Sequence, residues 1–237
     1  YSAIFTLNEK AEIKDWHLAH TVIRSNRRFT YEEVQQILER NGVASAEDLA
    51  LPGEHPEPLP AGSEPEGEYA TELITLNNLA KQLREKRFRN GAIGFDRAEV
   101  RFEIDEKGHP ISTYIKVAKD ANKLVEEFML LANKSVAEKI GIVPKGKKPK
   151  VLPYRIHDVP DPEKMEKLGA FVARFGYKIR TEGTKTEVSK SLNRLLCEVK
   201  GKKEENVFEM VALRAMMKAR YSIHNIGHYG LMFPYYT

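Results

Sequence analysis

Cysteine and long apolar runs are both scarce in this chain of 237 residues. The one cysteine, Cys197, cannot form a disulfide within the chain, so we expect a reducing, cytoplasmic environment. The longest apolar run, Phe128 to Ala132, is far shorter than the roughly 20 residues that cross a bilayer. These two features exclude a disulfide scaffold and a membrane span, and we expect no membrane partner.

Motifs that would name a reaction are also missing. No serine lies in a nucleophile elbow, no glycine-rich loop opens a helix, and no two aspartates are adjacent. His224 and His228 have a zinc-like spacing, but a glycine lies between them and no third ligand follows. The stretch from His157 to Asp161 offers oxygen and imidazole ligands, yet Asp161 before Pro162 is better interpreted as a helix N-cap. We therefore predict no metal site.

Charge is unevenly distributed, although the net charge is only +4. The stretch from Glu47 to Glu68 contains acidic residues and no lysine or arginine, whereas Lys81 to Arg89 and Lys145 to Lys150 are strongly basic. Basic segments suit a polyanionic partner, because their binding releases counterions from it. A solvated, lysine-rich loop has the same appearance in sequence, so both interpretations remain open.

The hydrophobic patterns predict an α+β fold, with an antiparallel sheet surrounded by helices. Hairpins are expected in residues 2–25, around a turn at Asn8, and in residues 100–117. Thr30 and Glu33 have the spacing of a capping box and predict a helix over residues 31–40. The other expected elements are helices at 68–89, from Asp120 to about Gly141, after Asp161, at 188–199 and at 204–221, and a short strand at 152–156.

We treat residues 1–237 as one partial domain that contains an insertion at about residues 45–68. Proline, glycine and glutamate dominate the insertion, so it cannot form a core of its own. The first residue is Tyr1 rather than methionine, and Tyr1 to Leu7 already has the pattern of a strand. We therefore expect the chain to be cut from a longer protein.

Phe95 is the residue whose position most suggests contact with nucleic acid. It follows the flexible stretch of residues 90–94 and precedes the second hairpin. From there its ring could stack on an RNA base, an interaction worth roughly 1–3 kcal/mol per base. A phenylalanine that packs in the core is the alternative.

Separated stretches of the chain together resemble the ribonuclease II and ribonuclease R family, in the family's order and spacing. They are Thr21 to Val34, Asn90 to Phe95, Lys119 to Asn133, Tyr154 to Asp158, Arg220 with Tyr221, Asn225 to Leu231, and Tyr235 to Thr237. Met232, Phe233 and Pro234 depart from the family pattern. The resemblance implies part of the catalytic domain of a magnesium-dependent, processive 3′-to-5′ exoribonuclease, which hydrolyses RNA to 5′-nucleotides.

The same resemblance implies roles for individual residues. Phe95 would stack at one end of the bound 3′-terminal nucleotides, and Glu126 would make a polar contact near the terminal nucleotide. Asn133, His157 and His228 also lie in matching motifs and are further candidates for RNA binding, although each could be a satisfied structural residue.

The family's Mg²⁺ ligands are clustered aspartates upstream of the matched segment, and its arginine motif follows that segment. We therefore expect Mg²⁺ to be bound by residues outside this segment of the parent enzyme, no catalytic residue within the segment, and no activity from the isolated chain. The expected partner is the single-stranded 3′ end of RNA, with no obligate protein partner. The alternatives are a non-catalytic RNA-binding module and a structural scaffold.

Overall fold

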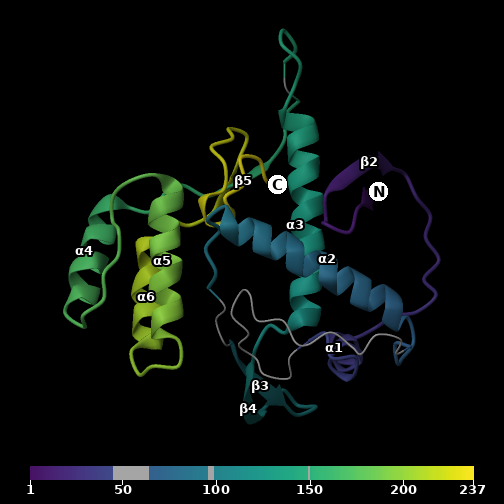
Figure 1. Cartoon of the computed structure of the whole chain (residues 1–237), viewed down its shortest axis with the longest axis horizontal. Helices are drawn as coiled ribbons and strands as arrows, with labels where there is room; N and C mark the ends of the chain where they lie inside the picture. The colour runs from purple at the N-terminus through teal and green to yellow at the C-terminus, as the bar shows by residue number, and fades with distance from the viewer. Residues whose placement is uncertain (45–63, 96–98, 149) are drawn as a thin grey trace. The chain divides into compact units, whose positions relative to one another are not determined.

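The computed structural model describes residues 1–44, 64–95, 99–148 and 150–237 (Figure 1). Within them the chain forms β1 (Ser2–Leu7), β2 (Ile13–Ala19), α1 (Tyr31–Arg40), α2 (Ala70–Arg89), β3 (Glu99–Ile104), β4 (Pro110–Lys116), α3 (Asp120–Gly141), β5 (Tyr154–Ile156), α4 (Pro162–Ala173), α5 (Lys185–Val199), α6 (Glu205–Ala215), β6 (Arg220–Ser222) and the 3₁₀ turn η1 (Tyr229–Leu231). The predicted α+β class with antiparallel strands is confirmed. Among the described residues, the strands pair two by two, β1 with β2, β3 with β4 and β5 with β6.

The chain divides into two compact units. The first unit contains residues 1–84 and 96–129, and the second contains residues 85–95 and 130–237. The boundaries between them therefore fall inside α2, after Phe95 and inside α3. Among the described residues, no helix is long and apolar enough to cross a membrane.

In the first unit, the predicted hairpin and capping box both form. Asn8 closes the β1–β2 turn, because its side-chain oxygen accepts hydrogen bonds from the N–H groups of Lys10 and Glu12. Thr30 accepts the N–H of Glu33, and the carboxylate of Glu33 accepts the N–H of Thr30, so the start of α1 is satisfied from both sides.

Asn41, buried at the end of α1, joins two stretches of the first unit that are far apart in sequence. Its side-chain nitrogen donates to the carbonyls of Ile37, at 2.7 Å, and Glu66, at 2.8 Å. Its side-chain oxygen accepts the N–H of Glu66 at 2.8 Å. The Asn41 amide thus pairs with both backbone groups of one residue, as a neighbouring strand would. Of the predicted insertion at 45–68, residues 45–63 lie outside the described residues.

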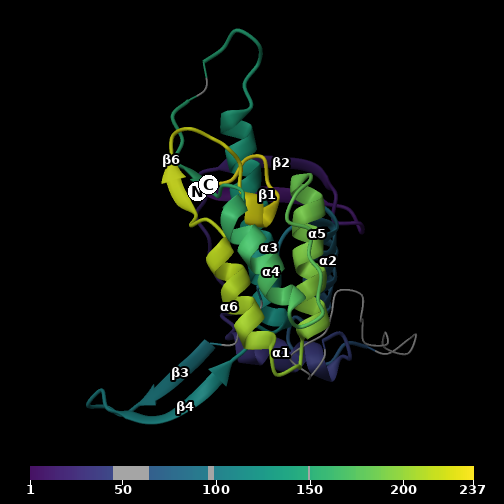
Figure 2. The same cartoon turned by 90° about the vertical axis from the view of Figure 1, so that its left-hand side faces the viewer.

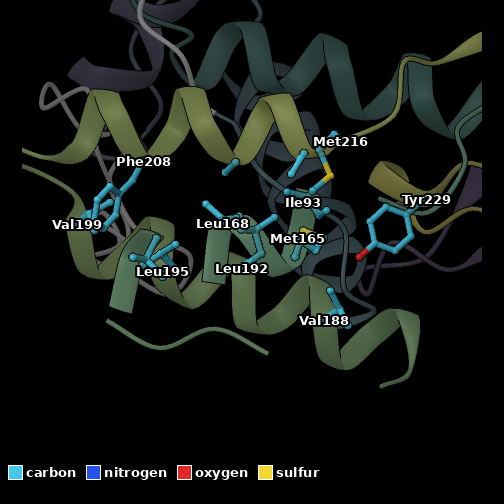
Figure 3. Close-up of a cluster of buried hydrophobic side chains, with 13 residues drawn as sticks. Ile93, Met165, Leu168, Val188, Leu192, Leu195, Val199, Phe208, Met216 and Tyr229 are labelled. Carbon is cyan, nitrogen blue, oxygen red and sulfur yellow. The ribbon is translucent and has the colours of Figure 1, made fainter. Parts of the chain in front are cut away.

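The second unit is built on a core between α4, α5 and α6, which pack side by side (Figure 2). Leu168 from α4, Leu192 and Leu195 from α5 and Phe208 from α6 are almost fully buried and point toward one another (Figure 3). Burying side chains of this size contributes roughly 1.5–3 kcal/mol each. Ile93 joins the same cluster, so this core also anchors the stretch that leads to Phe95.

Two of the helix boundaries expected from the sequence need correction. The helix expected at 204–221 ends at Ala215, and Arg220–Ser222 instead forms β6, which pairs with β5. In α3, burial does not follow hydrophobicity at every position, because Val125 is exposed and Glu127 is buried. Burial in α3 follows what the helix packs against, which its own sequence does not reveal. The helix expected from residue 188 begins earlier, after a second capping box formed by Thr184 and Glu187.

Candidate nucleic-acid interface

Phe95 lies at the end of an irregular stretch, residues 90–95, that is held by a side chain from α5. The side-chain nitrogen of Asn193 donates to the carbonyl of Ala92 at 2.7 Å, and its oxygen accepts the N–H of Gly94 at 3.3 Å. The amide therefore replaces the ladder partner that this stretch lacks. Phe95 itself is half-buried and packs against the core of the second unit, so part of its surface remains accessible.

Gly91, at the start of this stretch, has no room for a side chain. Its φ of +100° is a conformation that favours glycine, and a Cβ atom there would lie 2.7 Å from the Oγ of Ser189. Close packing against α5 and the left-handed turn together fix how the chain leaves α2 and approaches Phe95.

The peptide units around Gly230 connect the Phe95 stretch to the C-terminal segment. The carbonyl of Gly230 accepts the N–H of Ile93 at 2.9 Å, and the N–H of Gly230 donates to Nδ1 of His157 at 3.0 Å. A Cβ atom on Gly230 would lie 2.9 Å from that same Nδ1. Only glycine lets the backbone approach the imidazole this closely.

His157 uses both ring nitrogens within the second unit. Because Nδ1 accepts the N–H of Gly230, the ring proton of the neutral form lies on Nε2, which donates to the carbonyl of Met217 at 2.7 Å. Burial lowers the pKa of His157 below its usual range, which favours this neutral form. Each nitrogen thus satisfies a backbone group of the fold.

His228 lies beside His157, with the two ring centroids 5.0 Å apart. Its Nδ1 accepts the N–H of Leu231 at 3.2 Å and caps η1. Burial, and then the neighbouring His157, lower the pKa of His228 to about 4 from a usual value of 6.5. Near neutral pH both imidazoles are uncharged and hold backbone N–H groups.

Asn133 and its neighbour Lys134 reach the same C-terminal segment from α3. The side chain of Asn133 donates to the hydroxyl of Tyr236 over a long 3.5 Å, and the Tyr236 ring meets His228 edge-on at 5.5 Å. The ammonium group of Lys134 lies 5.2 Å from the centre of the Phe233 ring, a cation–π geometry. Asn133, His157 and His228 are therefore brought into one connected cluster.

Glu126 lies in the other unit and is exposed on α3. Its carboxylate is 3.9 Å from a guanidinium nitrogen of Arg84, which lies 3.7 Å from the carboxylate of Glu127. Glu127 is buried and Glu126 is not, so Glu126 retains solvent access at the edge of this ion pair. Phe95, Asn133, His157 and His228 belong to the second unit.

Some residues of this site were missed by sequence reasoning. Asn193 lies in none of the stretches that resemble the family, and Gly230 lies within Asn225 to Leu231 but was not singled out there. Both residues act by holding irregular backbone. The pair of Arg155 and Tyr221 was missed as well. The guanidinium of Arg155 lies 4.8 Å from the centre of the Tyr221 ring, which is a cation–π geometry. The signal for that pair was present, because β5 and β6 place these two residues directly opposite each other, but it depends on recognising β6 as a strand.

The stretch from His157 to Asp161 is occupied by structural contacts. Asp161 caps α4 by accepting the N–H of Lys164, as predicted, and Asp158 accepts the N–H of Val159. Across residues 1–44, 64–95, 99–148 and 150–237, no three His, Cys, Asp or Glu side chains are grouped so as to hold a metal ion.

Two solved structures resemble this chain in fold. The structure of Mycoplasma genitalium RNase R in complex with ribose methylated single-stranded RNA matches with a TM-score of 0.76 and 22% identity, over 98% of this chain and 32% of that one. Yeast Ssd1, described as a pseudonuclease, matches with a TM-score of 0.61 and 17% identity, over 99% of this chain and 26% of that one. At these identities, the two structures show a shared fold.

The sequence comparisons carry the family assignment. Ribonuclease R of Aquifex aeolicus (strain VF5) is 30% identical over 240 residues, which cover all of this chain and 30% of that protein. The chain thus spans about a third of the length of this relative. The family model of the RNB domain matches residues 1–237, and this chain therefore belongs to the RNB domain family, to which the resemblance in its motifs pointed.

Proposed function

We propose that this chain is the RNA-holding part of a magnesium-dependent, processive exoribonuclease that degrades RNA from its 3′ end to 5′-nucleotides in the cytoplasm. The observation that carries the proposal is the match of the RNB domain model to all 237 residues. The solved RNase R relative with single-stranded RNA supports RNA as the ligand class.

Each of the leading candidate residues suits a different part of RNA. The ring of Phe95 can stack on a base, which requires no particular base identity. The carboxylate of Glu126 accepts hydrogen bonds and donates none, so its partner must be a donor such as a ribose hydroxyl rather than a phosphate. Asn193 and Gly230 hold the backbone of the stretch that leads to Phe95, and His157 in turn holds Gly230.

Magnesium does not fit the residues that the structure describes. Mg²⁺ prefers carboxylate oxygens and water, and the described residues contain no suitable group of ligands. When bound to carboxylates, Mg²⁺ activates water and stabilises the leaving oxygen in phosphodiester hydrolysis. We assign no step to the metal and propose that its ligands belong to other residues of the parent protein.

A non-catalytic RNA-binding module is the second candidate function. The shared fold with a pseudonuclease favours it, because that relative retains the architecture. A module of this kind would keep the ring of Phe95 and the basic segments that bind RNA. It would lack the carboxylates that bind Mg²⁺ in an active enzyme.

Replacing Phe95 with alanine is expected to weaken binding of a 3′-tailed single-stranded RNA by roughly 1–3 kcal/mol, because one base loses its stacking partner. Fluorescence anisotropy at several salt concentrations measures the affinity of each variant. Phe171→Ala is a matched control, because Phe171 also packs at the edge of the same core but lies on α4.

If Phe95→Ala binds RNA as tightly as wild type and only unfolds more easily, the ring is a core residue and the site assignment fails. If the wild-type chain shows no salt-dependent RNA binding, the scaffold interpretation gains and the proposed function fails.

Asn193→Ala is expected to weaken RNA binding through Phe95, because it releases the backbone at Ala92 and Gly94. A double-mutant cycle with Phe95→Ala separates this from general destabilisation. Asn193→Ala should lower affinity in the wild-type background and change it little when Phe95 is already absent. Equal losses in both backgrounds would contradict a positioning role.

The 237-residue chain by itself is expected to bind 3′-tailed RNA without shortening it in the presence of Mg²⁺. The reason is that the clustered aspartates of the family resemblance have no counterparts in this sequence. Gel electrophoresis of end-labelled RNA measures the length, and a ribonuclease R from another source is the positive control. Magnesium-dependent shortening by the purified chain would refute this part of the proposal.

Folding stability is expected to fall as the pH decreases from 6.5 toward 4. The pKa of His228 is about 4 in the folded chain and 6.5 in the reference state, so in this range the unfolded chain binds a proton that the folded chain does not. The stability contributed by neutral His228 is complete above pH 6.5 and declines through this window. The decline is at most roughly 3 kcal/mol, and the solvent that reaches the ring makes it smaller.

Urea unfolding across this pH range tests the effect in wild type and in His228→Asn, which keeps an acceptor but does not titrate. The variant should lose less stability on acidification, whereas His224→Asn, at an exposed position, should behave as wild type. RNA affinity that rises on acidification and depends on His228 would instead indicate a cationic contact with phosphate.

A further inference from the structure

The two basic runs of the sequence have different surroundings in the structure. In α2, Lys81 lies 3.3 Å from the carboxylate of Asp120, and the Arg84 guanidinium is near two carboxylates. Arg89 lies 3.7 Å from the carboxylate of Glu85. Much of this positive charge is thus balanced locally, and the run serves the packing of the fold.

The second run follows α3 and is exposed over most of its described residues, 142–148, 150 and 151, which we call the lysine loop. Its lysines at positions 145, 147, 148 and 150 are all exposed. Within the described part of the chain, no ion pair or hydrogen bond involves any of their side chains. Among the described residues, no carboxylate therefore neutralises these four charges.

The lysine loop has a defined tip. The N–H of Lys147 donates to the carbonyl of Pro144 at 3.0 Å, and Gly146 within this turn has a φ of +87°. No described atom lies within 4 Å of where a Cβ on Gly146 would be, so Gly146 borders open space among the described residues. In both views the loop extends beyond the end of α3 (Figures 1 and 2).

Neither helix capping nor core packing accounts for this arrangement. The helix dipole acts within the last turn, where Lys139 already lies, whereas the lysines of the loop follow after Gly141. Like charges this close in sequence repel one another, and a carboxylate neighbour would relieve the repulsion. An external polyanion would relieve it in the same way.

The unit that carries the lysine loop is itself strongly basic. Residues 85–95 and 130–237 contain 24 lysines and arginines against 12 aspartates and glutamates, a net +12. The other unit has the remaining 14 against 22, a net −8, which together give the +4 of the whole chain. Positive charge is therefore concentrated in the unit that also holds Phe95.

We propose that the lysine loop is an accessory anchor for the phosphate backbone of RNA, separate from the stacking position at Phe95. The inference rests on the proposed function, since it takes RNA as the polyanion. Lysine ammonium groups act as flexible point charges and do not read bases, so the anchor is independent of sequence. Its contribution is made through counterion release and falls with salt.

The test replaces all four loop lysines with glutamine in the 237-residue chain: Lys145→Gln, Lys147→Gln, Lys148→Gln and Lys150→Gln. Affinity for a labelled single-stranded RNA without sequence bias is measured against salt concentration. For single strands, the salt slope falls by about 0.7 for each phosphate that the protein no longer neutralises, so four lysines predict a decrease of about 2–3. At about 0.1 M salt, that decrease corresponds to binding weaker by roughly 100-fold or more.

A matched variant controls for net charge. Lys164, Lys178, Lys190 and Lys203 are exposed lysines of the same unit, and replacing them with glutamine removes the same charge elsewhere. This control should retain a slope close to that of wild type. Circular dichroism should show both variants folded, because exposed lysines contribute little to packing.

The outcomes separate the two proposals. If Phe95→Ala weakens RNA binding and the loop variant does not, the anchor is refuted and the proposed function stands. If the loop and control variants lose the same RNA affinity, the effect comes from the net charge of the unit and not from the lysine loop, and the anchor is refuted as well. If only binding to vesicles of anionic phospholipid depends on the loop, the partner is a membrane surface and the RNA anchor is wrong. Without any RNA binding by wild type, both proposals fail.

Discussion

The backbone of Gly230 links the stretch that leads to Phe95 with the imidazole of His157. The carbonyl of Gly230 accepts a hydrogen bond from the N–H of Ile93, two residues before Phe95. The N–H of Gly230 donates a hydrogen bond to the imidazole of His157. Irregular backbone has no ladder to satisfy its polar groups, and burying them without partners would cost about 1–3 kcal/mol each. The geometry around Phe95 therefore depends on side chains that act as backbone partners, and on a glycine that lets one of them come close.

Helix starts could be predicted from the sequence, because the capping residues that determine them lie within a few positions of one another. The capping box at Thr30 and Glu33 fixed the start of α1, and the Asp161 cap fixed that of α4. The signal for α5 was equally local, since Thr184 and Glu187 form the same box. By contrast, β6 forms because Arg220–Ser222 finds β5, which is a pairing across more than 60 residues of sequence. Propensity along the chain cannot reveal such a pairing.

The candidate site divides in the same way. Phe95, Glu126, Asn133, His157 and His228 were reached through motif resemblance, and their roles toward RNA remain predictions. What the sequence could not supply is how they are held: Asn193 lies about 100 residues from the backbone that it bridges. When a side-chain amide pairs with backbone in place of a neighbouring strand, the pairing produces no periodic pattern in the sequence. Membership of the RNB domain family, however, was accessible, because the order of separate short stretches is itself a pattern.

The pairing of Asn41 with Glu66 has a consequence for how the chain tolerates variation in length. Because one buried amide fixes both backbone groups of Glu66, the two ends of the intervening segment are held together independently of what lies between them. Loop closure then depends only weakly on length, at about 0.6 kcal/mol for each doubling. An insertion after Ala44 and before Glu64 would therefore change the free energy of closing the Asn41–Glu66 pairing only slightly, whereas an insertion at Val43 would disturb the hydrogen bonds that its carbonyl accepts from Asn77 and Lys81.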